Sequence, residues 1–109
     1  MKWPAIKPYL LVTIAQDCCT CFVTPENLQA KEGDQIWFSN LTKDTVVVMF
    51  PDDKLFNEMQ IELGVDQVKA LTLRPVDRDS YPYTVYCKGC KDFADRAARP
   101  RIIVYDSRL

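Results

Sequence analysis

Apolar and polar positions alternate, at least in part, through residues 35–40 and 67–73, with the period of two that is typical of half-buried antiparallel strands. Residues 46–50 are apolar throughout, as in a central strand. Pro, Gly, Asp and Asn, which favour turns, separate the apolar segments. The pattern predicts strands at residues 9–16, 27–31, 35–40, 45–50, 67–73, 83–87 and 101–105.

Seven short strands with frequent turns favour an all-β fold, a Greek-key two-sheet β-sandwich, over a βα fold. An immunoglobulin-like topology is the structural alternative. Two segments break the strand pattern. We interpret residues 51–66 as irregular, and we expect about two helical turns within residues 92–99, ended by Pro100.

The length of 109 residues predicts one domain spanning residues 1–109, and an apolar content of 48% supplies one core. A net charge of −1 argues against nucleic-acid binding. The aliphatic stretch 9–15 is far shorter than the roughly 20 residues of a membrane helix, so we expect no membrane span. No export signal is evident in the sequence, because no small-residue cleavage site follows this stretch.

Two stretches carry a family signature. Residues 21–40 read CFVTPENLQAKEGDQIWFSN, with a Phe-x-x-Pro opening, a Gly-Asp turn and a strand that closes on Asn40. Residues 83–90 read YTVYCKGC, with Tyr83 four residues before Cys87. Together with the terminal strand 102–104, these stretches resemble the cupredoxin family, the plastocyanin-like and azurin-like electron carriers. The resemblance covers roughly residues 12–106 and implies a cupredoxin-like sandwich.

The resemblance also places the copper ligands. The copper cysteine falls on Cys87, and the two ligand histidines fall on Val46 and Cys90, in a chain that has no histidine. A blue-copper site needs two imidazoles, one thiolate and a weak axial donor, and no methionine follows Cys90. We therefore expect no blue-copper Cu(II) site. Family members usually work outside the cytoplasm, which implies a periplasmic or other extracytoplasmic location.

Five cysteines form two groups: Cys18, Cys19 and Cys21 before the Phe22 strand, and Cys87 with Cys90. The resemblance brings Cys21 towards the metal end of the sandwich, so the two groups are expected to meet. We predict a thiolate site for Cu(I) or Zn²⁺ at these cysteines, because soft thiolates select such ions. Structural disulfides and a thiol-disulfide redox role remain the alternatives. A bridge between the groups is favoured over a bond between the vicinal pair.

The sequence lacks the residue patterns of acid-base or nucleophilic catalysis, so we predict a non-enzymatic protein. Residues 51–66 carry five acidic side chains and one lysine, whereas residues 88–101 carry five basic side chains and two aspartates. Such patches are able to steer a partner protein. The leading hypothesis is soft-metal binding in copper handling or electron transfer. The alternative is a protein-interaction domain on a disulfide-stabilised cupredoxin scaffold.

Overall fold

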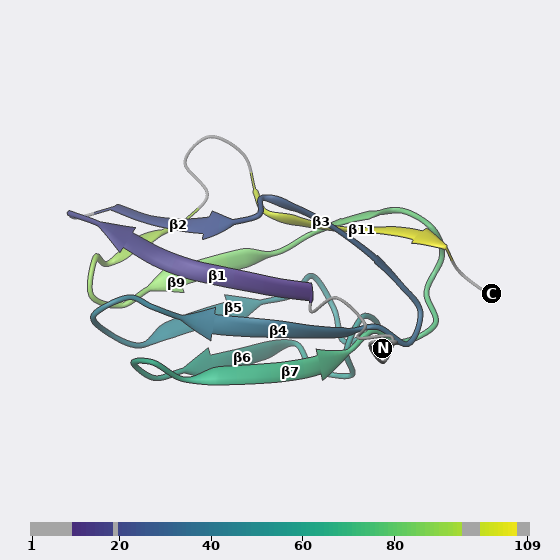
Figure 1. Ribbon diagram of the computed structural model, residues 1–109, viewed down its shortest axis with the longest axis horizontal. Coiled ribbons are helices and arrows are strands. Elements are labelled where there is room, and N and C mark those ends of the chain that lie inside the picture. The colour runs from purple at the N-terminus through teal and green to yellow at the C-terminus, as the bar shows by residue number, and fades with distance from the viewer. Residues whose placement is uncertain (1–9, 19, 95–98, 107–109) are drawn as a thin grey trace, which may run out of the picture.

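The fold is built from strands, as Figure 1 shows. A computed structural model describes residues 10–18, 20–94 and 99–106, and within these ranges it contains no helix. The strands are β1 (Leu10–Asp17), β2 (Thr20–Thr24), β3 (Asn27–Lys31), β4 (Gln35–Asn40), β5 (Val46–Met49), β6 (Gln60–Leu63), β7 (Val68–Thr72), β8 (Ser80–Pro82), β9 (Thr84–Cys87), β10 (Asp92–Phe93) and β11 (Arg101–Asp106).

The strands form three hydrogen-bonded sheets. One has the order β2-β1-β4-β7, the second β10-β9-β5-β6 and the third β3-β11-β8. Strands β1 and β4 are parallel, as are β3 and β11, whereas the other pairs are antiparallel. Figure 1 shows β1, β4 and β7 lying in front of β5, β6 and β9, so the first two sheets form the two layers. The predicted Greek-key two-sheet β-sandwich is confirmed.

All seven predicted strands are present, with ends that differ by at most one residue. The prediction that residues 51–66 are irregular is wrong at β6, which pairs with β5 from Val46↔Leu63 to Met49↔Gln60. The expected helix is wrong at Asp92 and Phe93, which form β10 against β9. Residues 95–98 of that expected helix lie outside the described residues. Both errors have one cause: pairing with a neighbouring strand overrides weak local propensity.

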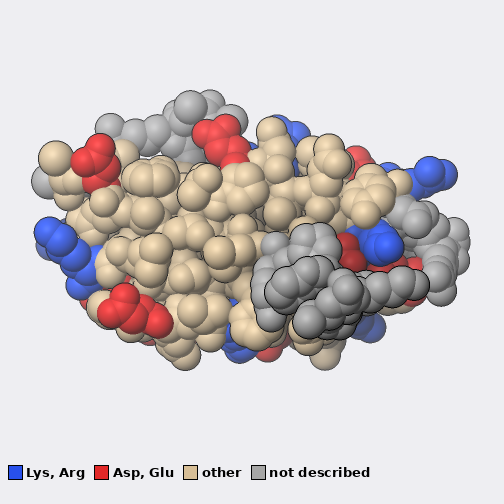
Figure 2. Space-filling view, viewed as in Figure 1, with Lys and Arg blue, Asp and Glu red and all other residues tan. Residues whose placement is uncertain are grey.

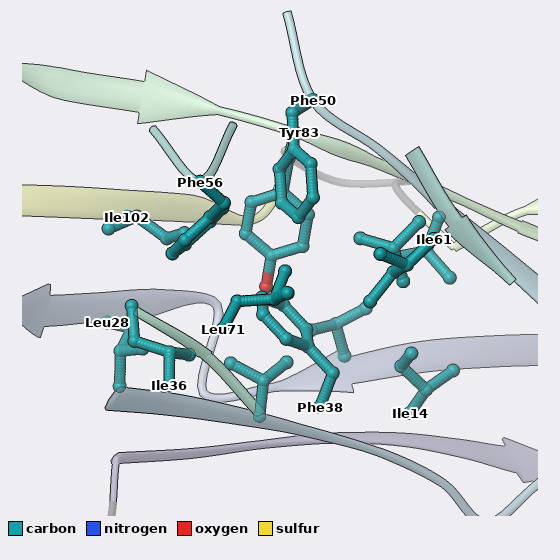
Figure 3. Packing of buried hydrophobic residues seen from close by; sticks show 14 of the residues in the cluster. Ile14, Leu28, Ile36, Phe38, Phe50, Phe56, Ile61, Leu71, Tyr83 and Ile102 are labelled. Carbon is teal, nitrogen blue, oxygen red and sulfur yellow. The ribbon is translucent and has the colours of Figure 1, made fainter. Parts of the chain in front are cut away.

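Aromatic rings fill the space between the layers (Figure 3). Phe38 is fully buried and packs edge-on against Phe50, Phe56 and Tyr83, with ring centroids 5.9–6.1 Å apart. Edge-to-face packing of this kind adds to the free energy gained by burying apolar area. The aromatic centre, as we call these four residues, holds the middle of the sandwich together.

The Gly-Asp turn read from the sequence joins β3 to β4. Gly33 has a positive φ of 87°, a conformation that a side chain at this position would strain. The amide of Asp34 donates to the carbonyl of Lys31, and the Asp34 carboxylate accepts a hydrogen bond from the Lys31 amide. This turn sets the start of β4, the strand that ends at Asn40.

Four connections come together at the left end of Figure 1: the β1–β2, β4–β5 and β6–β7 connections and the β9–β10 turn. Hydrogen bonds tie them to one another. The Lys43 amide donates to Gln16 Oε1, and the Lys88 amide donates to the Thr45 carbonyl. We call this end the sulfur end, because Cys21, Cys87 and Cys90 meet there. Strand pairing brings the connections to this end, since each one begins or ends a strand, and these hydrogen bonds hold them together.

Candidate thiol site

A disulfide joins the two layers at the sulfur end. Cys21 on β2 is bonded to Cys87 on β9, with Cα atoms 6.6 Å apart and a sequence separation of 66. Cys21 faces inward because β2 alternates buried and exposed positions, and Cys87 is the last residue of its strand. Both side chains are buried, with 6% and 1% of their surfaces exposed. The expected bridge between the two cysteine groups is thus present.

Cys90 is a free thiol beside this disulfide. Its Sγ lies 3.6 Å from Cys21 Sγ, and its side chain is partly buried against the core. The β9–β10 turn holds it there: the Lys91 amide donates to the Lys88 carbonyl, and β10 returns along β9. Three sulfurs from two distant segments therefore form one cluster.

Gly89 allows the β9–β10 turn to lie close to the β4–β5 connection. A Cβ at this position would lie 3.0 Å from the Cβ of Asp44, which is tighter than an ordinary contact, so glycine lets the turn pack against the β4–β5 connection without displacing Asp44. The glycine thus fixes where the Cys90 side chain starts.

The blue-copper ligand set does not fit this site. Val46 stands directly opposite Cys87 on the paired strand β5, and it is fully buried in the core. Directly opposed residues of an antiparallel pair project to the same face, so Val46 places an apolar side chain where the resemblance puts an imidazole. No step through a Cu(II) centre of that type is derived for this chain.

The structure describes only one of the other two cysteines. Cys18 is exposed and carries a free thiol in the β1–β2 connection, where its φ of 54° is left-handed. Cys19 lies outside the described residues. Among the residues that the structure describes, no three His, Cys, Asp or Glu side chains are arranged as a metal site. The disulfide accounts for this, because two of the three clustered sulfurs are bonded to each other.

A buried amide supports the sulfur end from within. Asn40 is fully buried, and its Nδ2 lies within hydrogen-bond distance of the carbonyl oxygens of Asp44, Leu63 and Gly64, at 2.9–3.0 Å. Its Oδ1 accepts from the amide and the hydroxyl of Thr42. In the sequence, Asn40 is recognisable only as the end of a motif. Its role as the link between the β4–β5 and β6–β7 connections depends on Leu63 and Gly64, which are distant in the sequence.

The two charged segments touch at this end. Lys88 Nζ lies 3.4 Å from Glu62 Oε1, so the basic segment and the acidic segment are joined by an exposed ion pair. On the face seen in Figure 2, charged side chains lie mainly near the rim, and the centre is uncharged.

The described residues include no helix long and apolar enough to cross a membrane.

Solved structures with the same fold are cupredoxins. A Cu(I) form of an amicyanin variant has a TM-score of 0.59 at 20% identity, over 92% of this chain and 86% of that one. A purple cupredoxin from Nitrosopumilus maritimus has a TM-score of 0.58 at 13% identity, over 86% of this chain and 97% of that one. Neither a family model nor a curated protein matches the sequence. The chain therefore has a cupredoxin-like fold.

Proposed function

We propose that the reduced form of this protein binds Cu(I) through the thiolates of Cys21, Cys87 and Cys90. The observation that carries the proposal is the meeting of these three sulfurs at one end of the sandwich, with Cys21 and Cys87 bonded and Cys90 3.6 Å from Cys21. Cleavage of the disulfide by two electrons leaves three thiols around one point. Soft thiolate sets of this kind select Cu(I).

The donor set favours Cu(I) over Zn²⁺. Structural zinc sites are almost always four-coordinate, whereas Cu(I) accepts three thiolates. The cluster supplies three sulfurs, one fewer than a four-coordinate zinc site needs. The absence of imidazole also disfavours Cu(II), so holding or passing on Cu(I) agrees better with the residues than electron transfer does.

Each residue has a separate part in this proposal. Cys87 and its neighbour Val46 are buried, so they keep water from one side of the cluster. Cys90, in the turn, is the more accessible sulfur and gives the ion a way in. Bound copper would supply a closed-shell soft cation that thiolates hold without an axial ligand. The disulfide agrees with an oxidising compartment, which supports an extracytoplasmic location for the oxidised form.

The test is a competition experiment under anaerobic conditions. Reduced protein, from which the reductant has been removed, competes with a chromophoric chelator for Cu(I). We expect one copper per chain after gel filtration. Cys90→Ser should weaken binding at least about tenfold, because it removes one of three soft ligands. Cys18→Ser is the matched control, since Cys18 is an exposed thiol outside the cluster. Equal copper retention by the two variants, or none by the wild type, contradicts the proposal.

Cu(II) gives a second readout. Added to the oxidised protein, it should produce no intense visible thiolate-to-copper band, because Val46 and Cys90 stand where the resemblance places imidazoles. A strong blue or red spectrum would contradict this account of the site.

The second candidate is a protein-interaction domain on a disulfide-stabilised cupredoxin scaffold, and the Cys21–Cys87 bond favours it. A partner would meet residues 51–66 and 88–101 together, because the Glu62–Lys88 ion pair joins them. This candidate requires that the oxidised protein, without copper, is the functional form. A free-thiol count on freshly isolated protein separates the two: a metal-bound reduced cluster supports the first and an intact disulfide supports the second.

A further inference from the structure

The three clustered sulfurs are unequal in exposure and in bonding. Cys21 and Cys87 are bonded and buried, whereas Cys90 is a thiol with part of its surface exposed. The Cys90 sulfur lies 3.6 Å from Cys21 Sγ, at van der Waals contact with one of the two bonded sulfurs. A thiol held against a disulfide is the arrangement from which thiol–disulfide exchange begins.

The contact is built by the fold. The Lys88 amide is tied to the Thr45 carbonyl and the Lys91 amide to the Lys88 carbonyl, so both sides of Cys90 are fixed. Gly89 lies in the same turn, so close to Asp44 that an added Cβ would lie 3.0 Å from the Asp44 Cβ. Because the turn is anchored, the thiol stays beside Cys21, and a fixed reactant reaches a high effective concentration.

We propose that Cys90 is an exchange thiol that isomerises the buried disulfide. The Cys90 thiol loses its proton to solvent, and its sulfur attacks Cys21 Sγ. The Cys21–Cys90 bond forms, the Cys21–Cys87 bond breaks, and Cys87 leaves as a thiolate that takes up one proton. The step moves no net electrons and needs no co-reactant. Closing 3.6 Å to a bond of about 2.05 Å needs a movement of about 1.5 Å, which rotation of the side chains supplies.

Isomerisation gives small-molecule thiols a route to a bond that is otherwise buried. In the Cys21–Cys90 isomer one bonded sulfur belongs to the more accessible residue. A thiolate such as that of glutathione attacks Cys90 Sγ, forms a mixed disulfide with Cys90 and releases the Cys21 thiolate. A second glutathione then frees Cys90 and leaves as part of oxidised glutathione. Two glutathione molecules are oxidised and one protein disulfide is reduced.

This exchange chemistry does not rest on the proposed function, because it needs no metal. It would act before copper binding by opening the disulfide and freeing Cys87. Experiments in metal-free buffer therefore test it separately.

The experiment uses full-length protein with Cys18→Ser and Cys19→Ser, so that only the three cysteines at the sulfur end remain. Acid quenching, alkylation and trypsin, which cuts after Lys88, separate the Cys87 peptide from the Cys90 peptide. We expect peptides joined through Cys21–Cys90 as well as through Cys21–Cys87. Glutathione should reduce this protein about tenfold or more faster than the same protein carrying Cys90→Ser.

The rate comparison remains informative if Cys90→Ser loosens the fold, because loosening would speed reduction instead of slowing it. Equal or faster reduction of a Cys90→Ser protein that keeps the melting temperature of its parent overturns the proposal. Adding Cys87→Ser to the background gives a second measurement. On oxidation this variant should form the Cys21–Cys90 bond, and the recovery of two free thiols overturns the proposal as well.

Discussion

The sulfur end and the aromatic centre stabilise the same sandwich by opposite means. At the sulfur end, directional links connect distant segments: the Cys21–Cys87 bond, and the hydrogen bonds of Asn40 to two loops. In the aromatic centre, Phe38 and its ring neighbours are held by contact area and edge-to-face geometry.

The contrast is sharpest between two buried polar side chains. Asn40 is surrounded by hydrogen-bond partners, whereas the hydroxyl of Tyr83 is buried without one. Figure 3 shows that hydroxyl pointing towards Leu71 and Phe38, among apolar side chains. A polar group therefore stabilises this protein only where the fold supplies its partners, and a hydroxyl in the apolar centre lowers stability.

The largest effect is expected from opening the disulfide. Cys21→Ser removes the bond to Cys87 and also prevents the alternative bond to Cys90. Opening a closed loop of 66 residues predicts a loss of about 4 kcal/mol in the free energy of unfolding. The link acts mainly on the unfolded chain, so the denaturant m-value should rise. Urea unfolding measures both quantities. Cys90→Ser, which leaves the bond in place, is the control, and an equal loss in that variant would contradict the assignment.

The next effect tests the hydrogen-bonded side of the comparison. Asn40→Ala leaves the carbonyls of Leu63 and Gly64 and the amide of Thr42 without this partner, so we expect a loss of about 3 kcal/mol. The m-value should stay unchanged, unlike that of Cys21→Ser, because the change acts on the folded state. Thr42→Val removes one hydroxyl of the same network and should cost only about 1 kcal/mol. Equal losses in the two variants would mean that Asn40 is not the centre of the network.

The smallest effect has the opposite sign. Tyr83→Phe removes a buried hydroxyl that lacks a partner, so the free energy of unfolding should rise by about 1 kcal/mol. Chemical denaturation near neutral pH measures this gain. A loss of stability would show that the hydroxyl has a partner, such as an ordered water, and that the two regions are less different than described.

The difference in stability between the wild-type protein and Tyr83→Phe should also depend on pH. Burial raises the pKa of Tyr83 above its usual value of about 10. Above that pH the unfolded phenol loses its proton while the folded one keeps it, so this contribution to stability is fully present below pH ~10 and is lost as the pH rises further. The advantage of Tyr83→Phe should therefore grow in alkaline solution. Both proteins carry Cys90→Ser for this measurement, to prevent disulfide exchange.

Local pattern alone was enough to predict seven of the strands and the turn between β3 and β4. The alternation at residues 35–40 produced Phe38 inside the core and Trp37 partly exposed, because successive side chains in a strand face opposite sides. Glycine at position 33 marked a turn that needs a positive φ. The family resemblance, carried by residues 21–40 and 83–90, anticipated the fold and placed Cys21 and Cys87 at the same end.

Only the tertiary structure decided which sulfurs are bonded and which groups pair. The Cys21–Cys87 bond depends on strands 66 residues apart, and from the sequence we predicted a metal site, with a disulfide as an alternative. Strand β6 formed in a segment with no clear pattern because β5 offered it an edge. The Glu62–Lys88 pair joined segments that the sequence shows as separate charged patches. Strand alternation is a property of neighbouring residues, whereas bonding and pairing depend on distances that exist only after the sheets have packed.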